Sequence, residues 1–420
     1  MNSKSKVSAF EILRIRDVRM IWFSQAIADF GDSLAALTLL MTVNKLSHST
    51  IALAAMAVVL AVPTILVGPL AGVCADRFNR KRIMLFSDGI RALLVLAFVI
   101  VSSSSYLWLI YLIGFMQASV GAFFQPARVA LVSTLVPHEK LLVMNSLFHT
   151  TRIVSNVAGA SLAAIAMGTL HIAWPAFVVN SATFAISLLF ISQVQTPLRV
   201  RAGEKGVSTV FEDLRVGIVT ITRNRALIGA LLVMGITLFG TGGLHMLTVS
   251  MLINNLRVSP GWYSVLQIAQ TVGMVVSGIV VSMLGARLMP IQTIRVSALV
   301  LGTSITALSW VANVGQLTLL LLAIGLSVMP LQISIATITQ SNVASEVRGR
   351  VASAITMVGS TANVLSMAVA GYLGEVSGIR HVYMYAGAVV ICAAIVSLFV
   401  FGSWAARNRA EAAAALPAAE

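Results

Sequence analysis

The stretch Gly72-Val73-Cys74-Ala75-Asp76-Arg77-Phe78-Asn79-Arg80-Lys81-Arg82 separates two long apolar segments, residues 50–75 and 83–103. Each segment is long enough to cross the hydrocarbon core of a bilayer, which takes roughly 20 residues of helix. Short charged islands between long apolar segments recur along the whole chain. The chain is 58% hydrophobic and only 10% charged, whereas a soluble domain has about 25% charged residues. The sequence therefore predicts a membrane protein.

Twelve apolar segments are predicted to be transmembrane helices, six before and six after a polar stretch. They cover residues 20–44, 50–75, 83–103, 106–132, 145–168, 172–193, 226–252, 261–284, 290–312, 316–340, 350–375 and 381–404. We therefore expect an all-α membrane protein built from two six-helix bundles. Its predicted parts are an N-terminal bundle at 1–194, a cytoplasmic linker at 195–225, a C-terminal bundle at 226–405 and a disordered cytoplasmic tail at 406–420. Within the linker, Phe211–Thr220 is predicted to form an amphipathic surface helix.

Lys and Arg are distributed unequally between the two sides of the predicted membrane. With the N-terminus in the cytoplasm, 21 of them lie in cytoplasmic segments, 3 in outside segments and 4 within helices. Cytoplasmic segments of membrane proteins are rich in these residues. The distribution predicts a multi-pass protein of the bacterial cytoplasmic (inner) membrane with both termini in the cytoplasm. It also accounts for the net charge of +14 without nucleic acid as a partner.

The two halves of the chain resemble each other. Gly72–Arg82 follows the second predicted helix, and Gly278–Arg287 follows the eighth, 206 residues later. Pro137–Glu139 precedes the fifth helix, and Ala344–Glu346 precedes the eleventh, 207 residues later. Two such offsets indicate two parallel six-helix repeats, and transporters with this design bind the substrate between the repeats.

The charged loop after the second helix is a candidate gate. Gly72 has no side chain, so it is predicted to let two helices approach closely. Asp76 lies at the cytoplasmic end of the helix and can pair with Arg77, Arg80 or Lys81. It can also face the positive N-terminal end of another helix that begins at the same surface. Such a contact would latch the cytoplasmic side, whereas the alternative is an ordinary basic loop with one salt bridge.

This loop resembles the signature Gly-x-x-x-Asp-Arg-x-Gly-Arg-Arg of the major facilitator superfamily, with Asn79 at the second glycine. More narrowly, the chain resembles the macrolide-efflux and siderophore-export branch of drug:proton antiporters. The features that carry this resemblance are Arg16-Asp17-Val18-Arg19, Phe30-Gly31-Asp32, Phe123-Phe124-Gln125-Pro126-Ala127-Arg128 and Asn145-Ser146-Leu147. Two antiporter features are absent: Gly114–Gly121 has no arginine, and Asn156–Ala160 has no Gly-Pro pair. The resemblance covers about residues 10–405 and implies the major facilitator fold, a monomer and no cofactor.

Two acidic residues lie inside the first predicted helix. Asp29 and Asp32 are three residues apart and share a helix face with Gln25. Counted from Met20, they lie roughly 13 to 18 Å along the helix, near mid-membrane, where ionisable residues are costly and usually functional. Two carboxylates in a low-dielectric place are expected to titrate as a unit. We predict proton coupling with Asp32 as the principal proton carrier and Asp29 tuning it; the alternative is a structural, hydrogen-bonded pair.

Other polar residues within the helices have weaker assignments. Asp88 and Arg91, three residues apart, are predicted to be a self-neutralised pair with a structural or gating role. Arg152 is expected to pair with one of the acids of the first helix or to attract an anionic substrate. The resemblance implies a substrate cavity between the halves, lined by the first, fourth, seventh and tenth helices. The candidate lining residues are Gln25, Gln117, Arg152, His245, Phe239 and Gln332.

These features favour a secondary transporter rather than an enzyme. The predicted function is proton-coupled efflux of amphipathic small molecules (drugs, macrolides or siderophore-like compounds) by alternating access, as in multidrug resistance. Its expected partners are membrane lipids, a lipophilic substrate and protons. The alternatives are a facilitator-fold importer, a lysophospholipid flippase and, less favoured, a membrane-embedded enzyme.

Motifs of the competing classes are absent from the sequence. There is no Asp-x-x-x-Asp cluster at a cytoplasmic helix end, no His-x-x-x-His pair and no Gly-x-x-x-x-Gly-Lys-Ser/Thr loop for a nucleotide. The two cysteines, Cys74 and Cys392, form no disulfide framework or metal-ligand pattern. We therefore expect neither a metal nor a nucleotide to take part.

Overall fold

The computed structural model describes residues 12–100, 106–137, 140–170, 172–195, 207–284, 289–343 and 347–414. These ranges are mainly helical and contain no β-strand. The chain divides into two compact units, Met1–Ser208 with Val258–Ser264 (unit 1) and Thr209–Arg257 with Val265–Glu420 (unit 2). The division falls within the predicted linker, of which residues 196–206 lie outside the described residues.

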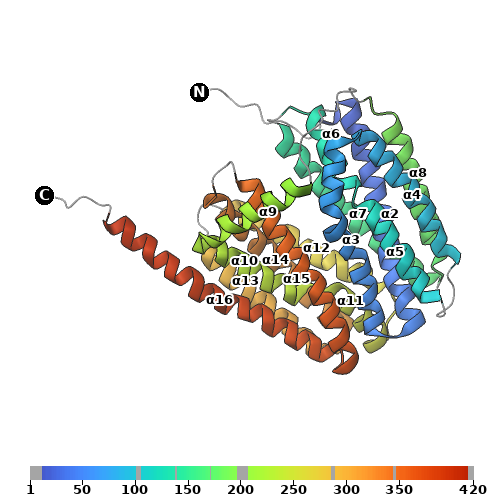
Figure 1. Cartoon of the computed structure of the whole chain (residues 1–420). Helices are drawn as coiled ribbons and strands as arrows, with labels where there is room; N and C mark the ends of the chain where they lie inside the picture. Colours follow the sequence, from blue (N-terminus) through green and yellow to red (C-terminus); the bar gives the residue numbers. More distant parts are fainter. Residues whose placement is uncertain are drawn as a thin grey trace. The chain divides into compact units, whose positions relative to one another are not determined.

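Figure 1 labels the helices along the chain. Those of unit 1 are α2 (Arg16–Ser47), α3 (Thr50–Arg77), α4 (Arg80–Ala97), α5 (Leu107–Gly121), α6 (Phe124–Leu135), α7 (Leu141–Thr169) and α8 (Trp174–Ser192). A linker helix follows, α9 (Val207–Thr222). The remaining helices are α10 (Arg225–Thr241), α11 (Leu244–Ser250), α12 (Trp262–Leu284), α13 (Pro290–Ala307), α14 (Val314–Ser341), α15 (Arg348–Val376) and α16 (Ile379–Ala414).

Eleven helical segments among the described residues are long and apolar enough to cross a membrane. Two of them join consecutive helices: Leu107–Leu135 combines α5 with α6, and Arg225–Asn255 combines α10 with α11 and a π-helical turn. The predicted span at 145–168 is α7, which has 29 residues and carries the polar residues Asn145, Arg152 and Asn156. The predicted all-α membrane fold with twelve long helical spans is therefore confirmed.

Side-chain caps explain where several helices begin. Ser49, Asn79 and Asn313 each accept a hydrogen bond of 2.9–3.3 Å from a backbone N–H in the first turn of α3, α4 and α14, respectively. The first N–H groups of a helix have no partner within the helix, so these caps stabilise the chosen starting points.

The last helix is longer than the sequence analysis predicts. We expect the helix to end near residue 404 and the segment 406–420 to be disordered, yet α16 continues without a break to Ala414 (Figure 1). The expectation is wrong for residues 406–414, because Ala, Arg and Glu dominate there and favour a helix even beyond the length that a bilayer requires. Residues 415–420 lie outside the described residues.

The linker helix α9 contains the predicted amphipathic segment and packs within unit 2. Its residues Leu214 and Ile221 belong to one hydrophobic cluster with Val351 of α15. Gly217 touches the start of α15, where a Cβ atom would collide with the Arg350 carbonyl. The apolar face of α9 is therefore covered by α15 and by its own neighbour α10.

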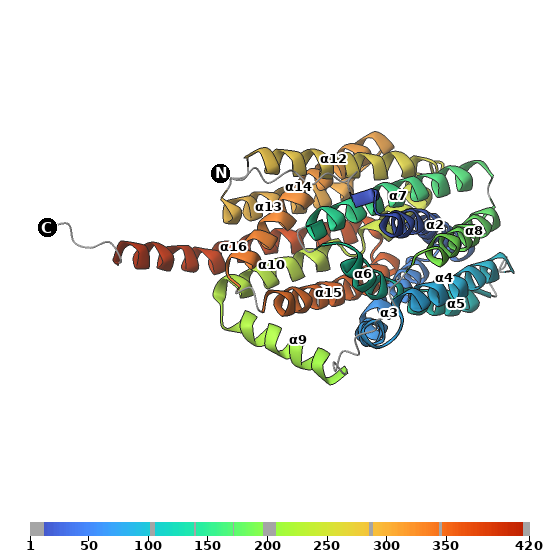
Figure 2. The ribbon, with the colours of Figure 1, turned by 90° about the horizontal axis from the view of Figure 1, so that it is seen from above.

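The two units have the same internal packing scheme. In unit 1, α2 packs against α7 and α8, and α4 packs against α5 and α8; Figure 2 shows α2, α7 and α8 side by side. In unit 2, α10 packs against α15 and α16, and α13 packs against α14 and α16. In the order of the spans, α10 corresponds to α2, α13 to α4 and α16 to α8. This is the arrangement expected from an internal duplication.

Candidate functional site

Asp32 in α2 forms an ion pair with Arg91 in α4. Arg91 Nη2 lies 2.6 Å from Asp32 Oδ1 and 2.5 Å from Asp32 Oδ2. Hydrogen bonds of this length between charged groups are among the strong ones in proteins. The side chain of Arg91 is 11% exposed, whereas that of Asp32 is 35% exposed. The cation is thus enclosed, whereas the carboxylate is about one-third exposed.

Arg91 also lies near a second carboxylate, Asp88, one turn earlier in α4. Its Nη1 is 3.8 Å from Asp88 Oδ1, and its guanidinium lies 4.2 Å from the centre of the Phe184 ring of α8. Asp88 is fully buried, and its Oδ2 accepts a hydrogen bond of 2.5 Å from Ser187 Oγ. The Asp88–Arg91 pair predicted from the sequence is present, but the closer partner of Arg91 is Asp32.

Asp29 has different partners from Asp32. It is 8% exposed, and its Oδ1 accepts a hydrogen bond of 2.7 Å from Gln25 Nε2. Its Oδ2 is buried and has no hydrogen-bond partner among the described residues. Asp32, Arg152 and Arg128 act on it electrostatically. The two acids therefore interact through charge, but one is held by an amide and the other by a guanidinium.

Close contacts hold the acid-bearing part of α2 against its neighbours. A Cβ atom at Gly159 of α7 would collide with the Phe30 carbonyl, and one at Gly31 would collide with side chains of α8. Ser33 Oγ donates a hydrogen bond of 2.6 Å to the Asn156 carbonyl of α7. Glycine permits such approaches because it has no side chain. The backbone around Asp29 and Asp32 is thus fixed from two sides.

The candidate gate contains two cations with structural partners. Arg80 donates to one carbonyl in α3 and one in α6, at 3.3 and 2.8 Å. Lys81 Nζ donates to two carbonyls at the C-terminal end of α8, at 2.7 and 2.8 Å. Asp76 and Arg77 make no ion pair in the part of the chain that the structure describes. The pairing of Asp76 with its neighbouring cations, one of the two sequence-based interpretations, is therefore absent from this structure.

Gly72 does not lie at a close helix contact. The sequence predicts that this glycine lets two helices approach, yet a Cβ atom there would meet no described atom within 4 Å. The tightest approaches in unit 1 occur at Gly31 and Gly159 instead, because these glycines lie in the packed interior around α2.

The six residues predicted to line a substrate cavity belong to both units: Gln25, Gln117 and Arg152 to unit 1, and Phe239, His245 and Gln332 to unit 2. In unit 1 the two glutamines are buried and the arginine is exposed. The amide oxygen of Gln117 has no hydrogen-bond partner among the described residues. In unit 2 the histidine and the glutamine are exposed and the phenylalanine is half-buried.

The sequence analysis missed the contribution of α8. Ser187 binds the Asp88 carboxylate, and Phe184 covers the Arg91 guanidinium. A signal was available, because the polar residues Asn180, Thr183 and Ser187 recur at helical spacing in a span that is otherwise mostly apolar. The Asp32–Arg91 pair joins residues 59 positions apart, and no local pattern predicts such a contact.

Comparisons with known proteins agree with this architecture. The family model of the Major Facilitator Superfamily matches residues 21–367. The chain is 23% identical over 387 residues to macrolide efflux protein A of Streptococcus pyogenes, covering 90% of this chain and 94% of that protein. It is 27% identical over 218 residues to the putative bacilysin exporter BacE of Bacillus amyloliquefaciens, covering 51% of this chain and 53% of that protein.

Solved transporter structures share the fold. A bacterial homologue of the iron transporter ferroportin in an inward-facing state aligns with a TM-score of 0.74 at 15% identity, over 93% of this chain and 99% of that chain. The peptide transporter POT in complex with sulfate aligns with a TM-score of 0.70 at 13% identity, over 92% and 94%. Family and neighbours alike are transporters rather than enzymes. Since the family match spans most of the chain, the protein belongs to the major facilitator superfamily.

Proposed function

We propose that this chain is a secondary active transporter that exports amphipathic small molecules in exchange for protons, by alternating access between its two units. It resides in the bacterial cytoplasmic membrane with both termini in the cytoplasm. The excess of Lys and Arg in the segments assigned to that side supports this orientation. The names of the relatives, an efflux protein and a putative exporter, support export rather than import.

The observation that carries proton coupling is the Asp32–Arg91 ion pair between α2 and α4. An ionised Asp32 holds Arg91 at 2.5 Å, whereas a protonated Asp32 loses this attraction. Arg91 then still has Asp88 at 3.8 Å as a second anionic partner. Proton binding thus shifts Arg91 from one carboxylate to another and weakens a contact between two spans. A ligand moves a conformational equilibrium only by such differential contacts.

Asp29 is assigned a tuning role. When ionised, it repels the like charge of Asp32, and two carboxylates that interact in this way are expected to titrate as a pair. Gln25 donates to one oxygen of Asp29 and leaves the other without a partner in the described part of the chain. We therefore propose Asp32 as the proton carrier and Asp29 as its modulator.

The gate is proposed at Asp76 and Arg77, with Arg80 and Lys81 as its structural supports; Gly72 belongs to the same motif but lies at no close helix contact. Arg80 and Lys81 are bound to carbonyls at helix ends and keep the loop in place. Asp76 and Arg77 have no ion pair among the described residues, so both are available for contacts that form in another state of the transport cycle.

The substrate is proposed to be a drug, macrolide or siderophore-like compound. Its contacts are assigned to Gln25, Gln117, Arg152, Phe239, His245 and Gln332. Five of these side chains are polar, and a small number of polar groups among apolar helices can orient such a ligand. The unbonded amide oxygen of the buried Gln117 supports a polar contact there, since buried acceptors normally have a donor.

The test uses the purified protein in liposomes that contain a pH-sensitive dye, with an imposed proton gradient and a panel of macrolides, lipophilic cations and siderophores. The proposal predicts substrate-dependent proton movement in the wild type. No proton movement with any ligand, from protein that is normally folded, would contradict proton coupling and favour a facilitator or a lipid flippase.

A further inference from the structure

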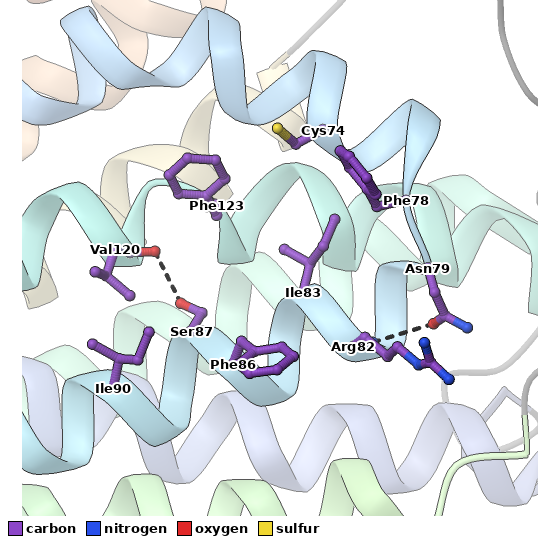
Figure 3. Close-up of a pocket in the computed structure, with 10 residues that line it drawn as sticks. All are labelled: Cys74, Phe78, Asn79, Arg82, Ile83, Phe86, Ser87, Ile90, Val120 and Phe123. Atoms are coloured by element: carbon purple, nitrogen blue, oxygen red, sulfur yellow. Dashed lines mark hydrogen bonds between the residues drawn. The ribbon is translucent and has the colours of Figure 1, made fainter.

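A cavity of about 460 Å³ lies in unit 1 between α3, α4 and the turn that joins α5 to α6. Figure 3 shows the residues that line it: Cys74, Phe78, Asn79, Arg82, Ile83, Phe86, Ser87, Ile90, Val120 and Phe123. None of these residues belongs to the Asp32–Arg91 network or to the candidate substrate contacts. The cavity is therefore separate from the proposed proton and substrate sites, although Cys74, Phe78, Asn79 and Arg82 belong to the Gly72–Arg82 loop.

The walls of the cavity are apolar. Aromatic and aliphatic side chains surround it, with Phe123 on one side and Phe86 on another in Figure 3. The Ser87 hydroxyl is already bonded, because it donates to the Val120 carbonyl at 3.0 Å. Asn79 accepts from the first turn of α4 at 3.2 Å. The walls thus favour a hydrocarbon group over a polar one.

One end of the cavity is positively charged. Arg82 lies at this end beside Asn79, whereas Ile90 and Val120 lie toward the other end (Figure 3). The Arg82 side chain is exposed, and its guanidinium makes no hydrogen bond or ion pair with the described residues. Arg80, by contrast, is held in place by hydrogen bonds to two backbone carbonyl groups. The N-terminal end of α4 adds partial positive charge at the same place.

The depth of the cavity matches the layers of a membrane. Arg82 is in the first turn of the span Arg80–Ile100 and therefore lies near the headgroup level. Ile90 is eight residues further along the same helix, which corresponds to about 12 Å toward the hydrocarbon core. A molecule that fills the cavity from end to end thus has a headgroup at Arg82 and a chain beside Ile90.

We propose that this cavity is a binding site for one anionic phospholipid of the surrounding bilayer. An acyl chain lies between Phe86 and Phe123, and the phosphate headgroup contacts Arg82. Basic side chains at the ends of membrane-spanning helices recognise anionic headgroups in this way. The site goes beyond the transport function, since a lipid here is a bound component of the protein and not its cargo.

Native mass spectrometry of the full-length protein from detergent doped with phosphatidylglycerol and phosphatidylcholine of equal chain length tests the proposal. The wild type should retain phosphatidylglycerol preferentially. Arg82→Gln should reduce this retention about fivefold, the change expected for one basic residue near a membrane surface. Ile90→Trp should narrow the cavity and reduce retention of both lipids. The matched control Arg223→Gln, an exposed arginine in unit 2, should leave retention unchanged.

Cys74 provides a second readout, because it lines the cavity and the protein has only one other cysteine. In Cys392→Ser protein, phosphatidylglycerol should slow the reaction of Cys74 with a maleimide, and Arg82→Gln should restore the rate. Inorganic phosphate should give no protection. The proposal is overturned by equal retention of both lipids in the wild type, by retention unchanged in both cavity variants, or by protection with phosphate alone.

Discussion

The two units share a packing scheme but differ in the charges that it buries. In unit 1 the contact between α4 and α8 encloses Asp88, which accepts a hydrogen bond from Ser187. In unit 2 the corresponding contact, between α13 and α16, contains Arg295, 207 residues after Asp88. Arg295 Nη2 lies 3.4 Å from the Ser397 carbonyl. The same place in the repeat thus holds an acid in one unit and a base in the other.

The difference extends to the rest of the network. At the offset of 207, the positions of Asp29, Asp32 and Arg91 are occupied in unit 2 by Ile236, Phe239 and Ala298. Unit 1 therefore has titratable groups in its interior where unit 2 has apolar ones. The duplicated scaffold thus provides the same packing in both units, whereas the proton coupling that we propose is assigned to unit 1.

The largest expected difference between the units is in proton coupling. Asp32→Asn replaces the carboxylate by an amide that does not carry a transferable proton. In liposomes with a macrolide and a pH gradient, proton movement should fall to the level of protein-free vesicles. Arg295→Gln, which removes a half-buried charge from unit 2 at the repeat position of Asp88, should stay close to wild type. An equal loss of proton movement in both variants would contradict the assignment of proton coupling to unit 1.

Stability should show the next difference. Arg91→Gln leaves Asp32 and Asp88 without their cation. Removing one partner of a fully buried pair costs about 3–5 kcal/mol, and we expect about 2–4 kcal/mol here because Asp32 is partly exposed. Arg295→Gln removes one long hydrogen bond, worth about 0.5–1 kcal/mol. Thermal unfolding of the purified variants in detergent compares them. A melting temperature for Arg295→Gln as low as that for Arg91→Gln would contradict the structure.

Alanine substitutions at two glycines of unit 1 compare a close helix contact, Gly159, with a motif position, Gly72. Gly159→Ala places a methyl group against the α2 backbone and should destabilise unit 1 by about 1–3 kcal/mol. Gly72→Ala, although it lies in the motif, should be neutral or slightly stabilising, because open space surrounds it and alanine favours a helix. In the same thermal unfolding measurement, a lower melting temperature for Gly72→Ala than for Gly159→Ala would show that Gly72 is the tighter contact.

The smallest expected difference in stability is between alanine variants of two buried serines, one in each unit. Ser187→Ala removes the donor to a buried carboxylate oxygen and should cost about 1–3 kcal/mol. Ser397→Ala removes only a bond to the Ala394 carbonyl of its own helix, and its effect should be within about 0.5 kcal/mol of wild type. If Ser397→Ala lost more stability than Ser187→Ala, the expected difference between the two units would be wrong.

The helical spans could be predicted from the sequence because the bilayer fixes their length and their apolar character. The end of α16 could not, since bilayer thickness does not limit a helix that leaves the membrane and continues through Ala-rich sequence. Asp29 and Asp32 were identifiable because charge is rare in spans. The partner of Asp32 was not, because spacing within α4 points Arg91 to Asp88 and only the tertiary contact between α2 and α4 brings Asp32 closer.

The most direct test of proton coupling through Asp32 measures proton release on substrate binding. Purified protein in weakly buffered detergent, with a pH-sensitive dye, receives a saturating macrolide, and tryptophan fluorescence verifies that the ligand binds. We expect proton release from the wild type and from Arg295→Gln, and none from Asp32→Asn. Undiminished release from an Asp32→Asn protein that binds the ligand normally would contradict it.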